Sequence, residues 1–257
     1  MPESESSSSL RLNKFLADAG LCSRRQADVL IQSGRVFVNG FQNLEFSTRI
    51  TPGVDVVTVD DRLVSVLSGH QKRYIAFHKP VGCLTTRVDK RGRTTIYDVL
   101  PADCRALDPA GRLDQDSSGL LFLSNDGDWV NRISHPRYHV AKRYKITIAR
   151  APASLAEFRQ ALEAGIWFEA EQKLARAYHI ECTPEDNPRV FSLTLHTGYK
   201  RQIRRMFKSL GHPVVSLCRM AIGSVELADL PLGMTRSLTE EELMSFICDD
   251  MPSSNGF

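Results

Sequence analysis

The chain has 257 residues, of which 42% are hydrophobic and 25% are charged, and this composition is typical of a soluble globular protein. Its length suits one large domain with or without a small companion, and no apolar run is long enough to cross a membrane. The formal net charge of +3 is too small to name a partner by itself. Residues 200–208 nevertheless hold five cations and no acid: Lys200, Arg201, Arg204, Arg205 and Lys208. Such a cluster favours a polyanion, although a solvated helix face is the commoner explanation of a basic run.

The two ends of the chain and its cysteines bear on its location. Residues 1–9, MPESESSSS, are acidic and serine-rich where a secretory signal would be basic and then apolar, so they predict a disordered leader. Residues 248–257 predict a flexible tail. The six cysteines are widely scattered, with no pair at metal-ligand spacing. They predict reduced thiols in a cytoplasmic protein and no metal site.

Residues 10–58 predict a small module of two helices and a β-hairpin. A short helix is expected at residues 12–19. A second helix is expected to begin at Ser23, because its hydroxyl and the Gln26 side chain can satisfy free amides of the first turn as a capping box. Gly34 suits the end of that helix.

A hairpin is expected to follow the second helix. The stretch RVFVNG, residues 35–40, alternates in the manner of a strand, and its Asn-Gly pair favours a tight turn. Residues 59–72 are poorly patterned and are interpreted as a linker. Four cations gather on the two helices and their approach: Arg11, Lys14, Arg24 and Arg25. By themselves they would most often be solvated surface.

The stretch LRLNKFLADAGLCSRRQADVLIQSGRVFVNG, residues 10–40, resembles the S4 RNA-binding domain from end to end. The resemblance implies that two helices and a small hairpin present basic side chains to structured RNA. It therefore places RNA binding ahead of the surface interpretation for the four cations just named.

Residues 73–247 contain mixed strands and helices without regular βαβ alternation, which favours an α+β architecture. Strands are expected at residues 74–78, 120–124, 144–149, 190–196 and 214–217. One helix is expected after Ser154, with Glu157 in its first turn and Gly165 at its end. Another is expected at residues 201–210. The least patterned segment is 170–188.

The helix expected at residues 201–210 has two contrasting faces. Its apolar side chains lie at helical spacing: Ile203, Met206, Phe207 and Leu210. Its cations repeat that spacing about 160° around the axis. Cations near a helix N-terminus oppose the macrodipole and cost about 0.3–1 kcal/mol each when exposed. Anionic RNA or a buried carboxylate would offset that cost.

The stretch GRLDQDSSGL, residues 111–120, allows three interpretations. A calcium loop starting at Asp114 fails at its twelfth position, because Asn125 cannot supply the bidentate carboxylate. A glycosidase pair would use Asp114 and Asp116, which are two residues apart on an extended chain, but nothing else supports it. A polar turn before a buried strand is the favourite from these residues alone.

Four further stretches accompany GRLDQDSSGL along the chain: HKPVG at 78–82, KRYKI at 142–146, GYKRQIRRM at 198–206 and VSLCR at 215–219. Together the five stretches resemble, in family order, the motifs of the pseudouridine synthases, with Ile146 where the family has Val. With the preceding S4 module, the chain is identified as a member of the ribosomal branch that contains RsuA, RluB, RluE and RluF. This resemblance implies a catalytic domain with a mixed, mainly antiparallel sheet flanked by helices and loops.

The resemblance also implies the site. Asp114 is expected to be the catalytic carboxylate, with Arg204 paired to it and Tyr144 as an aromatic against the target base. Leu217 is expected to line the pocket, and Lys79-Pro80 to support the site rather than to react.

Three arginines are expected to contact the substrate. Arg201 and Arg205 would meet phosphates, and Arg112 would fill space vacated by a flipped base or bind the backbone. The reaction that the family implies is the isomerisation of a uridine in ribosomal RNA, with base flipping. It needs no redox change or group donor, so no cofactor is expected, and a monomer is favoured.

Two other function classes compete with this one. An RNA-binding or ribosome-assembly factor could keep the fold without catalysis, and its mark would be the loss of Asp114, Tyr144 or Arg204, all of which are present. A nucleoside-cleaving hydrolase would be distinguished by the release of free uracil.

Overall fold

The structure is a computed structural model, and it describes residues 9–65, 71–182 and 187–246. The chain divides into two compact units, Met1–Gln71 and Lys72–Phe257. The leader predicted for residues 1–9, apart from Ser9, and the tail predicted for residues 248–257 lie outside the described residues.

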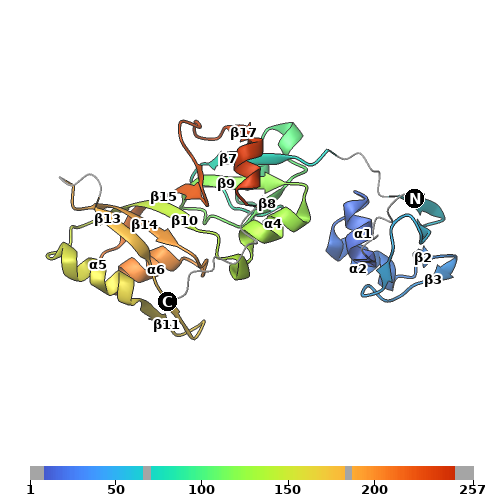
Figure 1. The fold of residues 1–257 in the computed structure, drawn as a ribbon, viewed down its shortest axis with the longest axis horizontal. Helices are drawn as coiled ribbons and strands as arrows, with labels where there is room; N and C mark the ends of the chain where they lie inside the picture. Colours follow the sequence, from blue (N-terminus) through green and yellow to red (C-terminus); the bar gives the residue numbers. More distant parts are fainter. Residues whose placement is uncertain (1–8, 66–70, 183–186, 247–257) are drawn as a thin grey trace, which may run out of the picture. The chain divides into compact units, whose positions relative to one another are not determined.

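The N-terminal unit consists of two helices and a small antiparallel sheet (Figure 1). Its helices are α1 (Leu12–Asp18) and α2 (Arg24–Gln32). A four-stranded sheet has the order β3-β2-β5-β6, with β2 (Val36–Val38), β3 (Phe41–Gln42), β5 (Val57–Val59) and β6 (Arg62–Val64). A separate pair joins β1 (Leu10–Arg11) to β4 (Arg49–Ile50). Apolar side chains from both helices and the strands form one core between them.

Local signals in the sequence account for this unit. The Ser23 Oγ accepts a hydrogen bond from the backbone amide of Gln26 at 3.3 Å, and the Gln26 Oε1 accepts one from the Ser23 amide at 2.9 Å. This is the predicted capping box, and α2 begins at the next residue. Asn39 and Gly40 both have positive φ, 52° and 82°, which fits the predicted tight turn between β2 and β3.

The predicted linker at residues 59–72 is wrong in its first part. Residues 62–64 form β6, which pairs with β5 and extends the sheet. The connecting turn uses Asp60 and Asp61, at φ 48° and 62°, and Arg35 Nε donates to Asp60 Oδ1 at 2.7 Å. Two aspartates in left-handed conformation give a weaker turn signal than Asn-Gly, so the sequence pattern did not reveal this hairpin.

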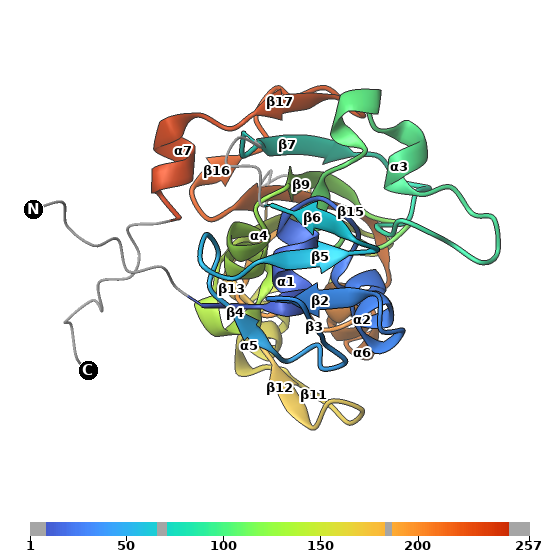
Figure 2. The same ribbon diagram turned by 90° about the vertical axis from the view of Figure 1, so that its right-hand side faces the viewer.

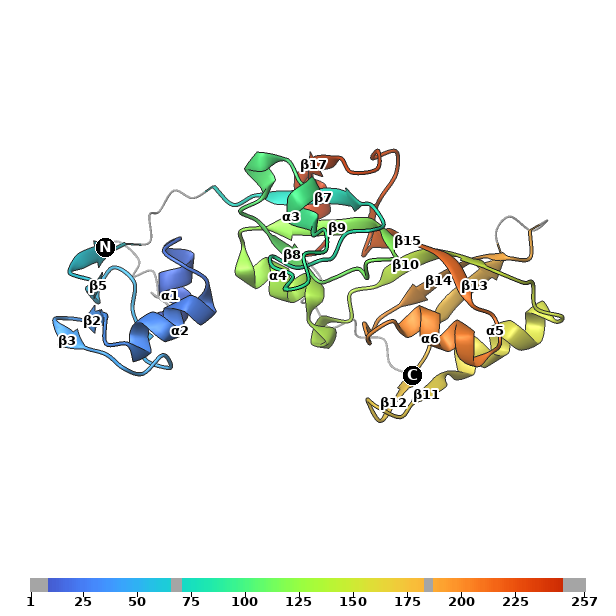
Figure 3. The ribbon, with the colours of Figure 1, turned by 180° about the vertical axis from the view of Figure 1, so that it is seen from behind.

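The C-terminal unit is built on a nine-stranded sheet (Figures 1 and 3). Its main path is β13-β14-β10-β15-β9-β7-β17, with β16 beside β15 and β8 beside β9. The strands are β7 (Tyr74–Lys79), β8 (Asp108–Ala110), β9 (Ser118–Ser124), β10 (Lys142–Ile148), β13 (Tyr178–Cys182), β14 (Val190–Leu195), β15 (Val214–Ile222), β16 (Val225–Glu226) and β17 (Thr235–Ser237). β15 and β9 run parallel, and the other paired strands of this sheet are antiparallel. The predicted α+β class with a mixed, mainly antiparallel sheet is confirmed.

Helices and a hairpin cover this sheet. They are α3 (Ile96–Val99), η1 (Ala102–Cys104), α4 (Gly127–Ser134), η2 (Pro136–Tyr138), α5 (Leu155–Ala164), α6 (Gln202–Ser209), α7 (Glu240–Met244) and the strands β11 (Ile166–Phe168) and β12 (Lys173–Ala175). The two-stranded sheet β11–β12 projects from the edge of the unit (Figure 2). β12 and β13 both lie in the segment 170–188, which the sequence left unpatterned. Residues 183–186 of that segment are outside the described residues.

The buried run Leu120–Leu123 in β9 shows why the sheet has a core on each face. Leu120 and Phe122 pack in the cluster that contains Trp129 of α4, whereas Leu121 and Leu123 pack in the cluster that contains Ile96 of α3. Successive side chains of a strand point to opposite faces, so a strand covered on both sides must be apolar without interruption. A third cluster joins α5 and α6 to β10, β13 and β14.

Candidate active site

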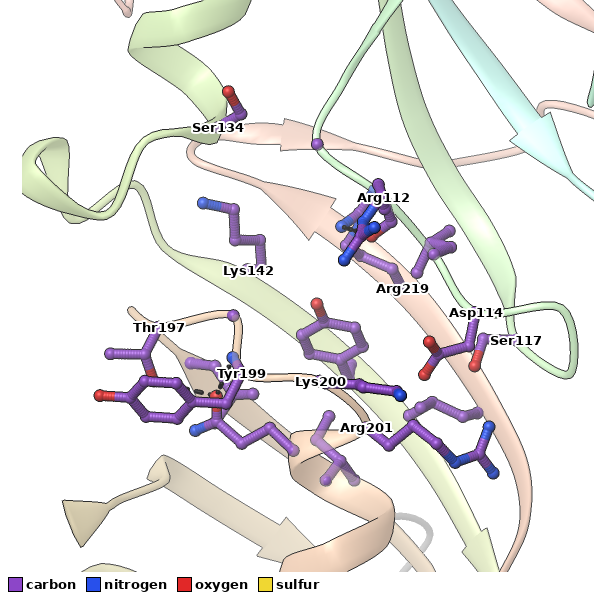
Figure 4. A pocket seen from close by; sticks show the side chains of 18 of the residues that line it. Arg112, Asp114, Ser117, Ser134, Lys142, Thr197, Tyr199, Lys200, Arg201 and Arg219 are labelled. Carbon is purple, nitrogen blue, oxygen red and sulfur yellow. Dashed lines mark hydrogen bonds between the residues drawn. The ribbon is translucent and has the colours of Figure 1, made fainter. Parts of the chain in front are cut away.

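A cavity of about 250 Å³ lies in the C-terminal unit. The loop before β9, the strands β10 and β15, and the segment leading into α6 surround it (Figure 4). Five cationic side chains line it: Arg112, Lys142, Lys200, Arg201 and Arg219. A single carboxylate, that of Asp114, is among the described residues of its lining.

The loop that carries Asp114 is fixed by Lys79, the last residue of β7. The Lys79 side chain is fully buried, and its Nζ donates hydrogen bonds to the carbonyl oxygens of Asp114 at 3.1 Å, Ser117 at 2.9 Å and Pro80 at 2.9 Å. Burial lowers the pKa of Lys79, because the charged form loses water. Three carbonyl dipoles thus replace its hydration and hold the loop backbone, which gives the HKPVG stretch a supporting role.

A close approach of two strands determines where this loop enters the sheet. Gly119 of β9 lies against the Arg219 backbone of β15, and a Cβ at Gly119 would come within 2.3 Å of the Arg219 carbonyl oxygen. The φ of Gly119 is also +113°, a conformation that L side chains rarely adopt. Only glycine fits this contact.

Arg219 also supports this loop, through hydrogen bonds to its backbone. It is 3% exposed, and its Nε donates to the Leu120 carbonyl at 2.7 Å and its Nη1 to the Arg112 carbonyl at 3.5 Å. The loop backbone therefore rests on two buried cations, Lys79 and Arg219, through backbone oxygens at positions 112, 114, 117 and 120.

Asp116 holds the N-terminus of α6 against this loop. Arg201 forms a bidentate pair with it, with Nη1–Oδ1 at 3.0 Å and Nη2–Oδ2 at 2.8 Å. Arg204 places its Nε 3.2 Å from Asp116 Oδ2 and donates from Nη2 to the Asp116 carbonyl at 2.6 Å. Burial opposes ionisation of Asp116, but the hydrogen bond from Arg201 and the charge of Arg204 lower its pKa overall.

The predicted ion pair between Arg204 and Asp114 is therefore wrong, since Arg204 pairs with Asp116. Gln115 and Asp116 form a turn, so the chain reverses between the two aspartates and presents one to α6 and the other to the cavity. The charge of Asp114 still acts at longer range. The hydrogen bond to Asp116 raises the pKa of Arg201, and the Asp114 carboxylate adds to that rise.

Arg201 also has an unusual backbone. It caps the start of α6 in the left-handed conformation, with φ 53° and ψ 36°. This region is uncommon for residues other than glycine and persists where the surroundings enforce it. The bidentate contact with Asp116 is such a constraint, and it places the guanidinium in the wall of the cavity.

Tyr144 and Leu217 provide the apolar part of the lining. Tyr144 is half-buried on β10, opposite Arg219 of β15, and it contacts the two core clusters on either side. Leu217 is 7% exposed and lies beside Ile146 in the sheet. The structure thus brings both predicted residues to the same cavity as Asp114.

The remaining predicted contacts divide into two groups. Arg112 is exposed and lines the cavity, as expected of a residue that meets substrate. Arg205 does not line it. Its guanidinium pairs with Glu171 at 2.7 and 2.9 Å and lies 3.6 Å from the centre of the Phe168 ring. One residue of helix turns the side chain by about 100°, so Arg205 faces the β11–β12 hairpin while Arg204 faces the loop.

Further cavity residues were not assigned a role from the sequence: Lys142, Tyr199, Lys200, Gln202 and Arg219. All five belong to the quoted motif stretches, so motif membership was the available signal. Their spacing could not show that they face one cavity, because it depends on the pairing of β10 with β15 and on the turn before α6.

In the N-terminal unit, Arg11, Arg24 and Arg25 are exposed and Lys14 is half-buried. Arg24 and Arg25 occupy the first turn of α2, and Arg24 Nη2 donates to Asn13 Oδ1 at 3.4 Å. Along the described chain, no helix is long and apolar enough to traverse a bilayer.

Comparison with known proteins identifies the family of the chain. Residues 73–209 match the RNA pseudouridylate synthase family, and residues 10–40 match the S4 domain. The chain is 38% identical over 238 residues to the dual-specificity RNA pseudouridine synthase RluF of Escherichia coli (strain K12). This alignment covers 92% of this chain and 78% of RluF. It is 35% identical over 234 residues to the ribosomal large subunit pseudouridine synthase B of Bacillus subtilis (strain 168), covering 91% and 93% of the two chains.

A solved structure gives the same result. The crystal structure of a pseudouridylate synthase matches with a TM-score of 0.66 and 33% identity, covering 92% of this chain and 99% of that chain. The resemblance drawn from the five motif stretches is thereby confirmed. The chain belongs to the RNA pseudouridine synthase family, in the RsuA-type group with RluF and RluB, and is an enzyme with an N-terminal S4 domain.

Proposed function

We propose that the protein converts a specific uridine of ribosomal RNA to pseudouridine, with Asp114 as the catalytic carboxylate and the target base flipped into the cavity. The observation that carries this proposal is that two neighbouring aspartates differ in their surroundings. Asp116 is engaged by two arginines, whereas Asp114 faces the cavity and forms no ion pair within the described residues.

The reaction is an isomerisation within one nucleotide. The bond between ribose C1′ and uracil N1 breaks, the base turns, and a bond forms between C1′ and C5. The proton of C5 is lost and N1 gains one, so neither an oxidant nor a group donor is consumed. A carboxylate can begin this by attacking the ribose, attacking the base or removing a ribose proton, and each route uses the ionised form of Asp114.

The surroundings of Asp114 suit these routes. Arg201 and Arg204 lie close enough for electrostatic interaction with it, yet their short contacts go to Asp116. The Asp114 oxygens therefore remain available to a substrate. Tyr144 and Leu217 supply an aromatic and an apolar surface on which the everted uracil can pack.

A cavity of about 250 Å³ is much too small for duplex RNA, so the target nucleotide must leave its helix. Eversion costs a few kcal/mol of lost stacking and pairing. Arg112 at the cavity edge can occupy the vacated space or hold the backbone, and cations nearby can bind flanking phosphates. The S4 unit adds a second attachment to RNA through Arg11, Lys14, Arg24 and Arg25, which raises the effective concentration of substrate.

Ribosomal RNA is the substrate class that the named relatives favour, since one of them is a ribosomal large subunit synthase. The enzyme would then act as a monomer in the cytoplasm, where ribosomes are assembled. No cofactor enters the proposal, because the chemistry is balanced without one.

The test is to map pseudouridines in ribosomal RNA from cells with the gene, without it, and with Asp114→Asn in its place. Pseudouridine leaves the mass of RNA unchanged but produces a carbodiimide-dependent stop in reverse transcription. One such stop should be present only with the wild-type gene, and purified enzyme should restore it in transcribed RNA. Unaltered RNA would indicate a binding or assembly factor, and released uracil would indicate a hydrolase; either result would overturn the proposal.

A further inference from the structure

The cavity has a second charged region, at the end away from Asp114. Lys142, at the start of β10, projects there toward Ser134 at the end of α4, while Asp114 and Ser117 lie at the opposite end (Figure 4). Arg112 and Arg219 also line this cavity.

Lys142 is held firmly, but by neutral groups. Its Nζ donates hydrogen bonds to the carbonyl oxygens of Val140 at 2.7 Å and Ile133 at 3.2 Å. An ammonium group has three protons, so these contacts leave one for a ligand. Burial of a cation without a counter-charge is unfavourable. Burial and the neighbouring charge of Arg219 accordingly lower the pKa of Lys142 to about 8.

Arg219 is a second cation that lacks a carboxylate partner. Its side chain is 3% exposed, its hydrogen bonds run to two backbone carbonyls, and its Nη2 has no hydrogen-bond partner within the described chain. The described lining of the cavity holds one acid, Asp114, and Asp116 already neutralises Arg201. The region around Lys142 therefore carries positive charge that the described protein groups do not balance.

We propose that Lys142 and Arg112, with the positive field of Arg219, bind a phosphodiester of the substrate strand next to the everted uridine. The inference rests on the proposed function, since an everted nucleotide must bring its own linkages to the rim of the cavity. Asp114 and Tyr144 then meet the ribose and base at one end, while Lys142 fixes the backbone at the other. Lys142 is thus a positioning residue that sets the register of the strand.

This arrangement has a consequence for pH. A bound phosphate stabilises the ammonium form, so the RNA complex binds more protons than the free enzyme, and affinity should fall as pH rises through about 8. Arg112 from the loop, Arg219 from β15 and His196 beyond β14 line the same cavity, whereas α4 contributes the Ser134 hydroxyl and the Ile133 carbonyl. A His196→Gln variant separates any contribution from that ring.

The experiment compares RNA binding by full-length protein carrying Asp114→Asn, which prevents turnover during the measurement. The ligand is an oligonucleotide around the mapped uridine, made either with natural linkages or with one uncharged methylphosphonate at each flanking position in turn. Lys142→Gln, Lys142→Arg and a control, Lys145→Gln, are introduced into this protein. Lys145 lies on the same strand, is exposed and does not line the cavity.

Lys142→Gln should weaken binding on the order of 10-fold and reduce the slope of log Kd against log salt by about 0.7. Lys142→Arg should keep most of the affinity and abolish its decline above pH 8. One particular methylphosphonate should weaken binding by the parent protein but have little further effect on Lys142→Gln, and Lys145→Gln should behave like the parent. Equal losses from every methylphosphonate in the parent and Lys142→Gln would overturn the phosphate site.

That failure would differ from a failure of the proposed function. If wild-type enzyme forms pseudouridine in the natural oligonucleotide while the Lys142 variants bind normally, only the phosphate site is lost. If wild-type enzyme forms pseudouridine nowhere in ribosomal RNA, no uridine is mapped, and the proposed function itself fails before any Lys142 variant is compared.

Discussion

The bidentate ion pair between Arg201 and Asp116, at 3.0 and 2.8 Å, joins the start of α6 to the loop that carries Asp114. Two residues apart in the chain, the aspartates have separate tasks. Asp116 determines where the loop lies relative to α6, and Asp114 faces the cavity. Mutations of the two should therefore have different effects on stability and activity.

Asp114→Asn should abolish isomerisation while leaving folding and RNA affinity largely intact. The carboxylate forms no ion pair within the described chain, so its loss removes little structure. Turnover should fall by at least about 10²–10⁴-fold, the usual contribution of a reacting side chain. Single-turnover kinetics with a binding assay would test this. Asp108→Asn, an exposed aspartate outside the cavity, is the control and should retain activity.

Asp116→Asn should reduce stability as well as turnover. It removes the charge that Arg201 and the mostly buried Arg204 share, and we expect a loss of about 1–3 kcal/mol in the free energy of unfolding. Denaturant titration would measure it. Its turnover should lie between that of the wild type and that of Asp114→Asn. A fully stable Asp116→Asn protein would show that α6 is held by other contacts.

The same ion pairs predict a dependence of stability on pH. The folded state lowers the pKa of Asp116 below its usual 3.8, since hydrogen bonding from Arg201 and the charge of Arg204 outweigh burial. The resulting stabilisation is present above pH 3.8 and is lost as the pH falls from there toward the folded-state pKa. Unfolding curves recorded between pH 5 and pH 2 should decline less steeply for Asp116→Asn than for the wild type. Identical slopes would contradict this account.

Lys79→Met should destabilise the loop that carries Asp114, because it removes hydrogen bonds to the loop backbone. The substitution keeps the approximate volume but removes the Lys79 donor from three carbonyl oxygens, of which the Ser117 oxygen takes part in a buried hydrogen bond. The Asp114 and Pro80 oxygens keep other donors, the Ser117 amide and the Cys83 thiol. Unsatisfied buried groups cost about 1–3 kcal/mol each, partly relieved if water enters. We expect a lower Tm and a reduced kcat at saturating RNA. Lys90→Met on the exposed loop after β7 is the control, and equal effects in the two variants would argue against a support role for Lys79.

Gly119→Ala should separate β9 from β15. The added methyl group would meet the Arg219 backbone at 2.3–2.8 Å, and neither strand can yield without losing the parallel pairing. A loss of at least about 2 kcal/mol in unfolding free energy is expected. Gly127→Ala is a matched control, because a methyl group added there would meet no atom within 4 Å and Gly127 begins α4. That variant should be neutral or slightly stabilised by thermal denaturation.

Much of this fold could be predicted because its signals are local. The capping box at Ser23, the Asn39-Gly40 turn and the helix between Ser154 and Gly165 each depend on neighbouring residues, and each is present. The continuous apolar run in β9 likewise predicted a buried strand. What local patterns could not give was the partner of each strand, since pairing depends on residues far away in the sequence.

The site was predictable to the same extent. Motif membership brought Asp114, Tyr144 and Leu217 correctly to one cavity. The partner of Arg204 was misassigned because Asp114 and Asp116 are alike in charge and differ only in which side of a turn they occupy. The pairing of Arg205 with Glu171 was not predicted, because helical spacing cannot show that a distant hairpin brings this carboxylate beside the helix.

The parallel contact between β9 and β15 involves two residue pairs, Ser118 with Cys218 and Gly119 with Arg219. β7 pairs with the far edge of β9 in one half of the sheet, and β10 pairs with the far edge of β15 in the other. β8 and β16 pair with the edges of β9 and β15 that face the seam, beyond the short parallel contact. Asp114 belongs to the first half of the sheet and Tyr144 to the second. Insertions in the peripheral loops of either half are therefore expected to leave the separation between Asp114 and Tyr144 unchanged, so the architecture can accept new surface loops without altering the cavity.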